Sequence, residues 1–404
     1  MKGKVCIAID FFPFPGGAQS IVREIYKALA TKYDVHFLTI APPTFSKEYK
    51  IHKIGKPSSH YLPFNPCIFP FNLIYILLGI LKLFYLQKKY KFKYILSQDG
   101  VFTGLYCSIV GKLTNTKVII MDYGATTNYY SNEYWSPLIE KAHGNWRSVL
   151  ALHTVFLRAS SFVAIRLTAI LADILMITGY ELKQIYLNKL RVPTNKLRSY
   201  QYCVDTIFYK PLGKNEIKRR REELGIPNNA ILINITCRLA PEKGIEYLMP
   251  ALNRLIKEHA NVFVIIIGGG ILDHYILTFI KKNKLEDRIY LLGILNRNQV
   301  LKFLQISDIF VYSGISGSNV SLAVLEAMSC GCAVIATNSP KYHEELLNGN
   351  NGIVIPTRSA VAIYKALKLL INSPELMEKM KNEARKTVIS KHSFSSFYNS
   401  LSFI

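Results

Sequence analysis

The sequence predicts an α/β fold made of two tandem Rossmann-like, doubly wound domains, each with a parallel sheet between layers of helices. Three observations lead to this prediction. The chain has 404 residues, enough for two or three domains of ordinary size, and half of its residues are hydrophobic. Short apolar segments alternate with segments of helical periodicity. The same alternation occurs in both halves of the chain, so we expect two sheets.

In the first half, a short β-rich segment at 5–9 leads through a proline- and glycine-containing loop at 11–17 into helical spacing over 18–30. The further apolar segments predict strands at 35–40, 94–97, 117–121 and 174–178. Because these strands are mostly apolar and do not alternate with polar residues, we expect them to be buried on both faces of a parallel sheet.

The second half repeats this plan. Its apolar segments predict strands at 230–236, 262–267, 289–292, 308–312, 333–336 and 353–355, with helices at 245–258, 275–283, 297–305, 320–330 and 359–371. We therefore assign residues 1–212 to a first domain and 213–390 to a second. A tail at 391–404 is expected to be able to cross back to the first domain. Two such domains predict a ligand cleft between the carboxyl ends of their sheets.

The formal net charge of +23 suggests an acidic partner, such as an anionic lipid or a phosphate-bearing substrate. Nucleic acid is disfavoured, because the basic residues are scattered and no RNA-binding or zinc-finger signature occurs. The seven cysteines include no Cys-x-x-Cys pair, which indicates free thiols in a reducing compartment. The chain begins with a strand pattern rather than a signal peptide. These features favour a cytoplasmic protein, peripheral on the inner face of the cell membrane.

One segment bears on the membrane question. Residues 68–86 are nearly all apolar but are interrupted by Pro70, Asn72, Gly79 and Lys82, and a basic segment follows at 87–93. A spanning helix needs about 20 apolar residues, so this segment is slightly short and carries an internal charge. A helix lying on an anionic membrane surface and a core helix of a soluble domain both fit the pattern.

A phosphate-bearing ligand can be neutralised by a divalent metal ion or by fixed cations. The sequence contains no Asp-x-Asp pair after a strand, so the fixed-cation solution is favoured and no metal or other cofactor is expected. Arg238 and Lys243 follow the strand 230–236, where both can reach a ligand at its carboxyl end. The alternative is that they are two solvated residues of a charged loop.

A second phosphate-binding element is expected after the strand 308–312. A loop rich in glycine and serine leads into the next helix, with Ser318 or Asn319 as its N-cap. Glu326 is the one acidic residue in this apolar helix and needs a partner, for which ribose hydroxyls would serve. A contact with a neighbouring helix is the alternative. The amides expected to bind phosphate at this helix start belong to Ser318, Asn319, Val320, Ser321 and Leu322.

Taken in order, these motifs resemble the retaining glycosyltransferases of family 4 (glycosyl transferases group 1), which have the two-domain GT-B fold. Within 231–356, the resemblance covers Arg238-x4-Lys243-Gly244, Gly268-Gly-Gly270, and Leu325-Glu-Ala-Met-Ser-Cys-Gly331. It implies that residues 1–212 form the acceptor-side domain and residues 213–390 the nucleotide-sugar-binding domain, in which Arg238 and Lys243 bind the donor diphosphate. It also implies that the turn after the strand 289–292 lines the nucleobase and that a glycine loop in the first half faces the diphosphate. The further donor residues are Gly293, Ile294, Leu295, Gly16 and Gly17.

The sequence departs from this family at two positions. The family has a glutamate eight positions before the one matching Glu326, and that position is Ser318 here, which leaves the donor sugar open. The family often has a histidine after a strand of the first domain, where this chain has Asp122. Asp122 is expected to contact the sugar or the acceptor, or alternatively to cap a turn with Gly124.

We therefore expect retaining transfer of a sugar from a nucleotide-diphosphate donor to a glycan or lipid-linked acceptor, with Arg238, Lys243, Glu326 and Asp122 as catalytic candidates. No protein nucleophile is evident, and the resemblance implies that the leaving phosphate receives the acceptor proton. A nucleotide-sugar-binding subunit without activity and an epimerase or phosphorylase on the same fold are the alternatives. A dinucleotide dehydrogenase is disfavoured, because neither glycine loop has Gly-x-Gly-x-x-Gly spacing with a following acid.

Overall fold

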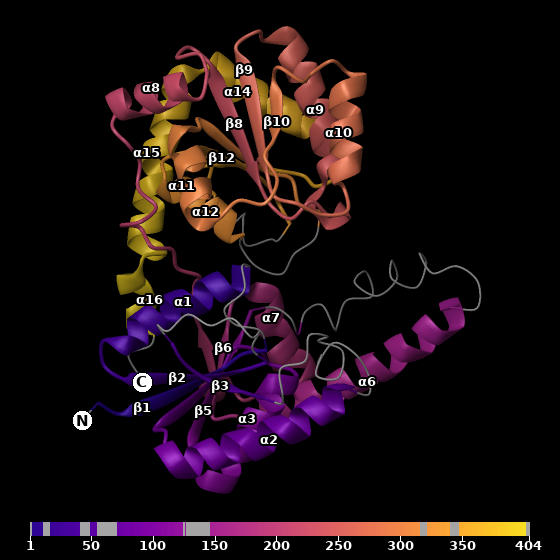
Figure 1. Ribbon diagram of the computed structural model, residues 1–404, viewed down its shortest axis with the longest axis vertical. Helices are drawn as coiled ribbons and strands as arrows, with labels where there is room; N and C mark the ends of the chain where they lie inside the picture. The colour runs from indigo at the N-terminus through magenta and orange to yellow at the C-terminus, as the bar shows by residue number, and fades with distance from the viewer. Residues whose placement is uncertain are drawn as a thin grey trace. The chain divides into compact units, whose positions relative to one another are not determined.

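The computed structural model describes residues 2–10, 17–40, 49–54, 71–123, 126, 146–315, 321–339 and 347–400. The chain divides into two compact units, Met1–Gln201 and Tyr202–Ile404. Each unit is built around one sheet, with all strand pairs parallel (Figure 1). The predicted α/β class of two doubly wound domains is thereby confirmed.

The sheet of the first unit has seven strands in the order β3-β2-β1-β4-β5-β6-β7. Its buried strands β1, β4, β5 and β6 coincide with the predicted ones to within one or two residues. Two short strands at the edges, β3 and β7, were not predicted, because they carry several polar residues. The bounds are β1 Lys4–Ala8, β2 Asp34–Thr39, β3 Lys50–Lys53, β4 Tyr94–Ser97, β5 Lys117–Asp122, β6 Ile174–Ile177 and β7 Leu197–Ser199.

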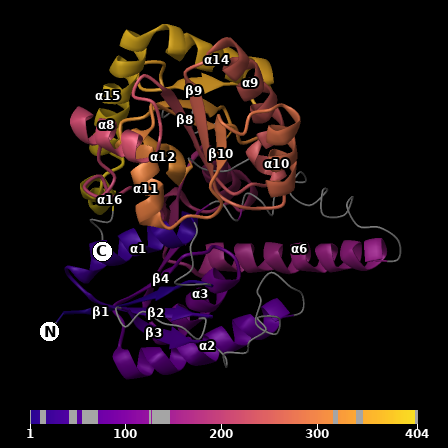
Figure 2. The same cartoon turned by 45° about the horizontal axis from the view of Figure 1, so that its top comes forward.

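Helices cover both faces of this sheet. Figure 1 shows α1 on one face and α2 and α3 on the other, and Figure 2 shows the length of α6. Helix α3 is buried almost throughout, because it packs against α2, α6 and the sheet. The helices are α1 Gly17–Ala30, α2 Phe71–Tyr90, α3 Phe102–Thr114, α6 Trp146–Leu171 and α7 Tyr180–Gln184, followed by a π turn at Ile185–Lys189 and a 3-10 turn at Thr194–Lys196.

The sheet of the second unit has six strands in the order β10-β9-β8-β11-β12-β13. Side chains of successive residues point to opposite faces: Ile233 and Ile235 join the core under α9 and α14, whereas Leu232 joins a smaller core with α11. The bounds are β8 Ile231–Thr236, β9 Val262–Ile267, β10 Ile289–Leu291, β11 Ile309–Tyr312, β12 Ala333–Thr337 and β13 Ile353–Ile355.

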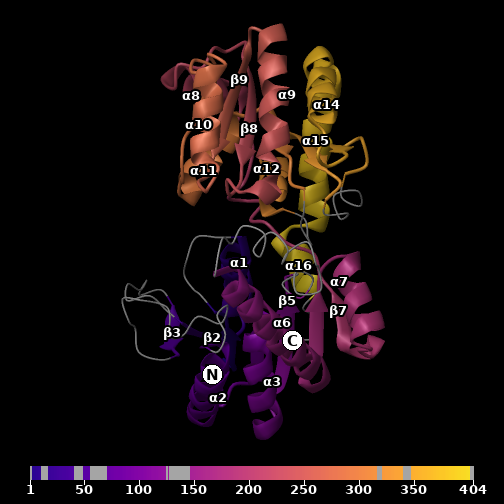
Figure 3. The same cartoon turned by 90° about the vertical axis from the view of Figure 1, so that its right-hand side faces the viewer.

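The helices of this unit also lie on both sides of the strands. Figure 1 shows α9 and α10 on one side and α11 and α12 on the other, and Figure 3 shows α9 beside α14. The very polar helix α8 was not predicted. The helices are α8 Lys214–Glu223, a 3-10 turn Pro241–Lys243, α9 Ile245–Glu258, α10 Asp273–Lys282, α11 Arg297–Ile306, α12 Leu322–Ser329, α14 Ala360–Asn372, α15 Pro374–Lys391 and α16 Phe394–Ser400.

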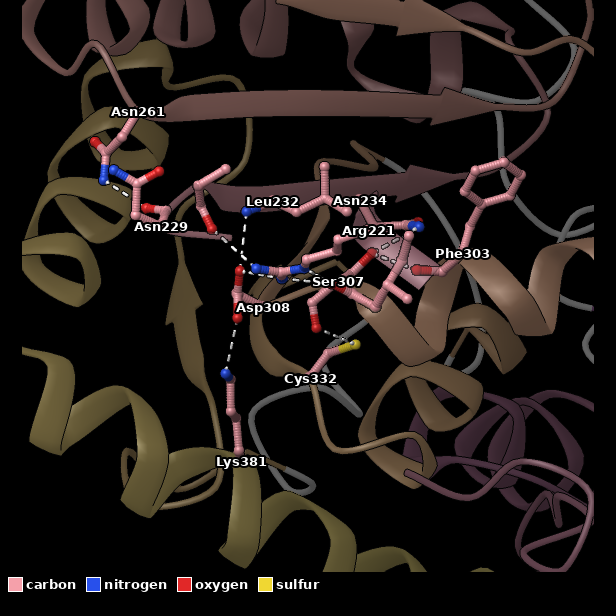
Figure 4. A network of polar contacts seen from close by, with 12 residues as sticks. Arg221, Asn229, Leu232, Asn234, Asn261, Phe303, Ser307, Asp308, Cys332 and Lys381 are labelled. Atoms are coloured by element: carbon pink, nitrogen blue, oxygen red, sulfur yellow. Dashed lines mark hydrogen bonds and ion pairs between the residues drawn. The ribbon is translucent and has the colours of Figure 1, made fainter. Parts of the chain in front are cut away.

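A buried ionic network fastens α8 and α15 to the amino end of β11. Asp308 accepts from Arg221 Nη2 at 2.7 Å, from Lys381 Nζ at 3.0 Å and from the backbone N–H of Leu232 at 3.0 Å (Figure 4). Arg221 also donates to the carbonyls of Ile306 and Ala230. Because every charge in this network is bonded, burial is tolerated, and the amino ends of β8 and β11 are held in register.

Candidate functional site

Both sheets have a topological switch point, where the connections that leave two neighbouring strands run to opposite faces of the sheet. In the first unit it lies between β1 and β4, and in the second between β8 and β11. Open parallel sheets bind ligands outside the carboxyl ends of the strands at such a point. The residues that follow these four strands are therefore the natural candidates for a site in each unit.

In the second unit, the loop after β8 rests on the loop after β11. Ser313 Oγ donates to the carbonyl of Lys243 at 2.8 Å, and the N–H of Ile315 donates to the carbonyl of Glu242 at 2.9 Å. Gly244 begins α9 with φ +65°, and a Cβ there would lie 2.1 Å from the carbonyl oxygen of Ser313. Only glycine allows this approach, so the local sequence fixes Lys243 beside the end of β11.

The two cations predicted to bind phosphate both follow β8. Lys243 Nζ lies 5.5 Å from the centroid of the Tyr312 ring. Arg238 has a side chain 71% exposed, and its guanidinium forms an ion pair with Glu242 at 2.5 Å. Both cations lower the pKa of the Cys237 thiol, which burial nevertheless raises to about 11. Arg238 and Lys243 thus belong to the same short loop, at the carboxyl end of β8.

A glycine run after β9 packs against the same loop. Gly268 has φ +137°, and a Cβ there would lie 1.8 Å from the carbonyl oxygen of Cys237. The N–H of Gly268 donates to the carbonyl of Gly293 at 2.8 Å, which joins this run to the turn after β10. In that turn Ile294 is 79% exposed, whereas Leu295 packs partly into the smaller core. The structure thus brings Gly293 and Ile294 to the edge that carries the two cations.

Helix α12, which follows β11, begins later than the sequence suggested. Its N-cap is Ser321, with φ −69° and ψ 128°, and the helix runs from Leu322. The predicted cap at Ser318 or Asn319 was therefore wrong, because the backbone becomes helical only after Ser321. The Ser321 side chain makes no capping hydrogen bond. The other predicted donor residues of this loop, Ser318, Asn319 and Val320, lie outside the described residues.

Glu326 lies on α12, partly buried, and interacts with the phenol of Tyr209. Burial raises the pKa of Tyr209, and the Glu326 carboxylate raises it further by repelling the phenolate and hydrogen-bonding to the phenol. Arg297 Nε donates to the Tyr209 hydroxyl at 3.2 Å, and the guanidinium lies 4.4 Å from the Phe208 ring centroid. Sequence reasoning missed Tyr209 and Arg297, since no spacing links them to Glu326.

In the first unit, Asp122 ends β5 and is fully buried. Its Oδ2 accepts from the Tyr186 hydroxyl at 2.8 Å, and a Cβ on Gly100 would lie 3.0 Å from the same oxygen. The Asp122 carboxylate thus lies between the buried Tyr186 hydroxyl and the backbone of Gly100. Gly17 begins α1. Gly16 and Gly124 lie outside the described residues.

Two further carboxylates, which sequence reasoning missed, lie at the switch point of this unit. Asp10 follows β1 and accepts from the Tyr75 hydroxyl at 2.9 Å and from Thr103 Oγ1. Asp99 follows β4 and accepts from the N–H of Thr103. Burial raises the pKa of Asp99, and repulsion by Asp10 and Asp122 raises it further. An acid within two residues of a predicted strand end was the signal available for both.

Within the described residues, no group of three or more His, Cys, Asp or Glu side chains is arranged to hold a metal ion. The described carboxylates at the switch point of the first unit are bonded to hydroxyls and backbone N–H groups.

The second unit has a counterpart among known protein families. Residues 216–387 match the family model of the glycosyl transferases group 1. The chain carries a glycosyl transferases group 1 domain. This domain includes the loop of Arg238 and Lys243, the glycine run and α12. The resemblance inferred from the motifs is confirmed at this level, and the assignment to family 4 stays a prediction.

Two relatives illustrate how far the likeness reaches. The chain is 28% identical over 189 residues to MJ1069 of Methanocaldococcus jannaschii, an uncharacterized glycosyltransferase, with 46% of this chain and 48% of that protein covered. It is 22% identical over 375 residues to the N-acetylgalactosamine-N,N'-diacetylbacillosaminyl-diphospho-undecaprenol 4-alpha-N-acetylgalactosaminyltransferase of Campylobacter jejuni, with 92% and 91% covered. The chain spans about half the length of the first curated relatives it matches.

The group 1 domain and the first unit together have the fold of solved glycosyltransferases. The Anabaena protein Alr3699/HepE, solved in complex with UDP-glucose, matches with a TM-score of 0.75 and 15% identity, over 99% of this chain and 98% of that one. At this identity the likeness shows the fold alone. The GT-B class predicted from the sequence is confirmed by it.

Proposed function

We propose that this chain is a retaining glycosyltransferase that moves a sugar from a nucleotide-diphosphate donor to a glycan acceptor without a metal ion. The observation that carries the proposal is the position of Arg238 and Lys243 at the β8/β11 switch point, on a loop bonded to the residues after β11. Two fixed cations there suit a diphosphate, because its charge is concentrated on two adjacent groups.

In this proposal the diphosphate lies against Arg238, Lys243 and the first amides of α12 at Ser321 and Leu322. The Glu242 carboxylate holds Arg238 in the ligand-free state, and a phosphate oxygen would take its place. As the bond between the anomeric carbon and the phosphate oxygen breaks, negative charge grows on the phosphate, and the cations stabilise it. The acceptor oxygen bonds to the anomeric carbon on the same face, and its proton passes to the leaving phosphate.

The donor and acceptor are proposed by class. HepE, with the same fold, was solved with UDP-glucose, and the Campylobacter relative is named for a diphospho-undecaprenol substrate. We therefore propose a nucleotide sugar as donor and a lipid-linked or membrane-proximal glycan as acceptor, with no role for nucleic acid. The six cysteines in the described part of the chain are free, which fits a cytoplasmic protein.

A second candidate is a nucleotide-sugar-binding subunit without activity. Ser318 at the expected position of an acid favours it, and so does Asp122, whose carboxylate is buried and already hydrogen-bonded to Tyr186. An epimerase on the same fold would convert the donor without any acceptor. The three candidates share the donor site and differ in product.

The test measures donor binding first and chemistry second. We expect one class of nucleoside diphosphate to raise the melting temperature of the purified chain, since a ligand at a hundred times its Kd stabilises by about 2.7 kcal/mol. The matching nucleotide sugar, incubated with membrane extract and EDTA, should then give a glycosylated product with retained anomeric configuration by NMR. Binding without transfer or hydrolysis would establish the subunit instead, and no stabilisation by any nucleotide would overturn the donor site.

A further inference from the structure

Helix α2 in the first unit is anchored in the protein core along one side. Tyr75 and Leu83 are fully buried, and Gly79 lies so close to Tyr106 that a Cβ would be 2.5 Å from its ring. Within the described residues, α2 is the one helix long and apolar enough to cross a membrane by length and composition. Its packing against α3 makes it part of the folded unit. This packing accounts for the apolar residues on the buried side of α2 but not for those on its outer side.

The opposite side of α2 is apolar and exposed. Leu73, Leu77, Leu81 and Tyr85 follow one another at intervals of four residues and are 49%, 58%, 60% and 56% exposed. This spacing places them in one row along the helix. The outer side of a helix in a soluble domain is normally polar, so a continuous apolar row marks an interaction surface.

Lysines continue this row at the carboxyl end of α2. Lys88 and Lys89 are exposed, and Lys88 Nζ lies 4.6 Å from the Phe84 ring centroid. Lys82 Nζ lies 5.9 Å from the Tyr85 ring centroid, within the helix itself. The sequence contains no aspartate or glutamate between residues 49 and 98, so no carboxylate of this segment offsets the lysines.

Helix α6 presents a second apolar row. Val163, Leu167 and Ile170 are 59%, 41% and 58% exposed, and the whole helix lacks acidic residues. Asn72 Nδ2 at the start of α2 donates to Ser160 Oγ of α6 at 2.8 Å. The two helices are therefore joined, and each contributes exposed apolar side chains to the same unit.

We infer that these outer rows of α2 and α6 dock the chain on an anionic phospholipid bilayer. The membrane face consists of Leu73, Leu77, Leu81, Tyr85, Val163, Leu167 and Ile170, with Lys88 and Lys89 at its basic end. The apolar side chains enter the boundary between headgroups and acyl chains, and the lysines meet the lipid phosphates. A second copy of the chain is disfavoured as the occupant, because pairing two such faces would bring lysines together without carboxylates.

This inference rests on the membrane-proximal acceptor of the proposed function, but it uses residues of the first unit alone, none of which the proposed function assigns to the donor. It assigns the lipid surface to a specific pair of helices. Docking by half-buried side chains and lysines is reversible, which distinguishes it from a spanning helix.

The experiment is co-sedimentation of the full chain with vesicles of phosphatidylcholine, alone or with about a third phosphatidylglycerol. We expect binding to the anionic vesicles that weakens in high salt and with phosphatidylcholine alone. The double variant Leu77→Gln/Leu81→Gln should lower the partition coefficient about tenfold or more, from the apolar area lost. The variant Lys88→Gln/Lys89→Gln should lower it roughly fivefold per lysine.

Matched controls use residues of comparable exposure on the second unit, Leu277→Gln/Leu369→Gln and Lys281→Gln/Lys282→Gln, which should bind like the wild type. Glutamine has a helix propensity close to that of leucine and lysine, and equal melting temperatures would show that all variants fold. The inference is overturned if the wild type does not bind anionic vesicles, or if the α2 variants bind them with the partition coefficient of the wild type. It is also overturned if sedimentation shows a dimer that Leu77→Gln/Leu81→Gln abolishes.

Failure here is separable from failure of the proposed function. Stabilisation of the chain by a nucleoside diphosphate requires no membrane, and Leu77→Gln/Leu81→Gln should leave it unchanged. Nucleotide binding without vesicle binding would end the docking inference alone. Vesicle binding without nucleotide binding would end the donor-site proposal alone.

Discussion

The ammonium of Lys243 lies 5.5 Å from the centroid of the Tyr312 ring, at the topological switch point of the sheet in the second unit. The ring belongs to β11, whereas the lysine belongs to the loop after β8. Burial raises the pKa of Tyr312, an effect that Lys243 partly offsets, so the phenol stays neutral beside the cation. The contact holds the lysine in place before any ligand arrives, which is the condition for strong electrostatic stabilisation of a leaving group.

The first prediction concerns this lysine and its neighbour. Lys243→Ala and Arg238→Ala should each lower kcat about 10²–10³-fold, the usual cost of removing one fixed donor to a developing charge. The melting temperature should change little, because neither side chain is buried. Steady-state transfer assays on the purified variants measure the effect.

The control for this prediction is Lys257→Ala, which removes an exposed lysine of α9 on the same unit. It should leave turnover unchanged, which separates a local effect from the loss of overall charge. Full turnover in both Lys243→Ala and Arg238→Ala would show that the leaving group is held elsewhere.

The sequence predicted those parts of the fold that depend on local patterns. Strands β8, β9 and β11 are mostly apolar, so their bounds agree with the prediction to within one residue. The edge strand β3 and helix α8 were missed. Polar residues dominate both, and neighbouring elements stabilise them more than their own periodicity does.

In the candidate site, too, the residues placed by local sequence were predicted and those placed by the tertiary fold were not. Arg238 and Lys243 were found because a strand end and a loop fix their position locally. Tyr209 and Arg297 beside Glu326 were not found, since only the folded chain brings residues so far apart in sequence together.

The second prediction concerns Asp99. Because its folded pKa is raised, first by burial and then by Asp10 and Asp122, its contribution to stability is full below the unfolded pKa of about 4 and is lost as the pH rises through the folded pKa. Asp99→Asn should therefore stabilise the chain at pH 8, on the order of 1 kcal/mol, with the gain shrinking towards pH 4. Urea unfolding at both pH values measures this.

The exposed Asp287→Asn serves as the control for Asp99→Asn and should unfold like the wild type at either pH. A loss of stability at pH 8 in Asp99→Asn would contradict the prediction. It would mean that the hydrogen bond from the N–H of Thr103 to the Asp99 carboxylate outweighs the repulsion of Asp99 by Asp10 and Asp122.

The third prediction concerns Asp308, which lies at the amino end of β11, opposite the carboxyl ends that carry the candidate site. Burial raises the pKa of Asp308, but the charges of Lys381 and Arg221 outweigh burial and hold it below its usual range. Asp308→Asn leaves the buried Arg221 without a carboxylate and leaves Lys381 with the exposed Glu378 alone, and the loss of a partner in a buried ionic network typically costs about 3–5 kcal/mol. The free energy of unfolding in urea at pH 7 should fall by about this amount, with transfer activity retained wherever the protein is folded.

The sign of the pH dependence follows from the lowered pKa of Asp308. Its contribution to stability is present above the unfolded pKa of about 4 and is lost as the pH falls through the folded pKa, so wild type and Asp308→Asn should converge only in acid. Glu378→Gln is the control, because Glu378 bonds the same Lys381 at 2.9 Å but is 61% exposed, and exposed pairs contribute less than about 1 kcal/mol. Equal losses in both variants would mean that the network stabilises the unit through Lys381 alone, and that Arg221 is sufficiently bonded by the carbonyls of Ile306 and Ala230.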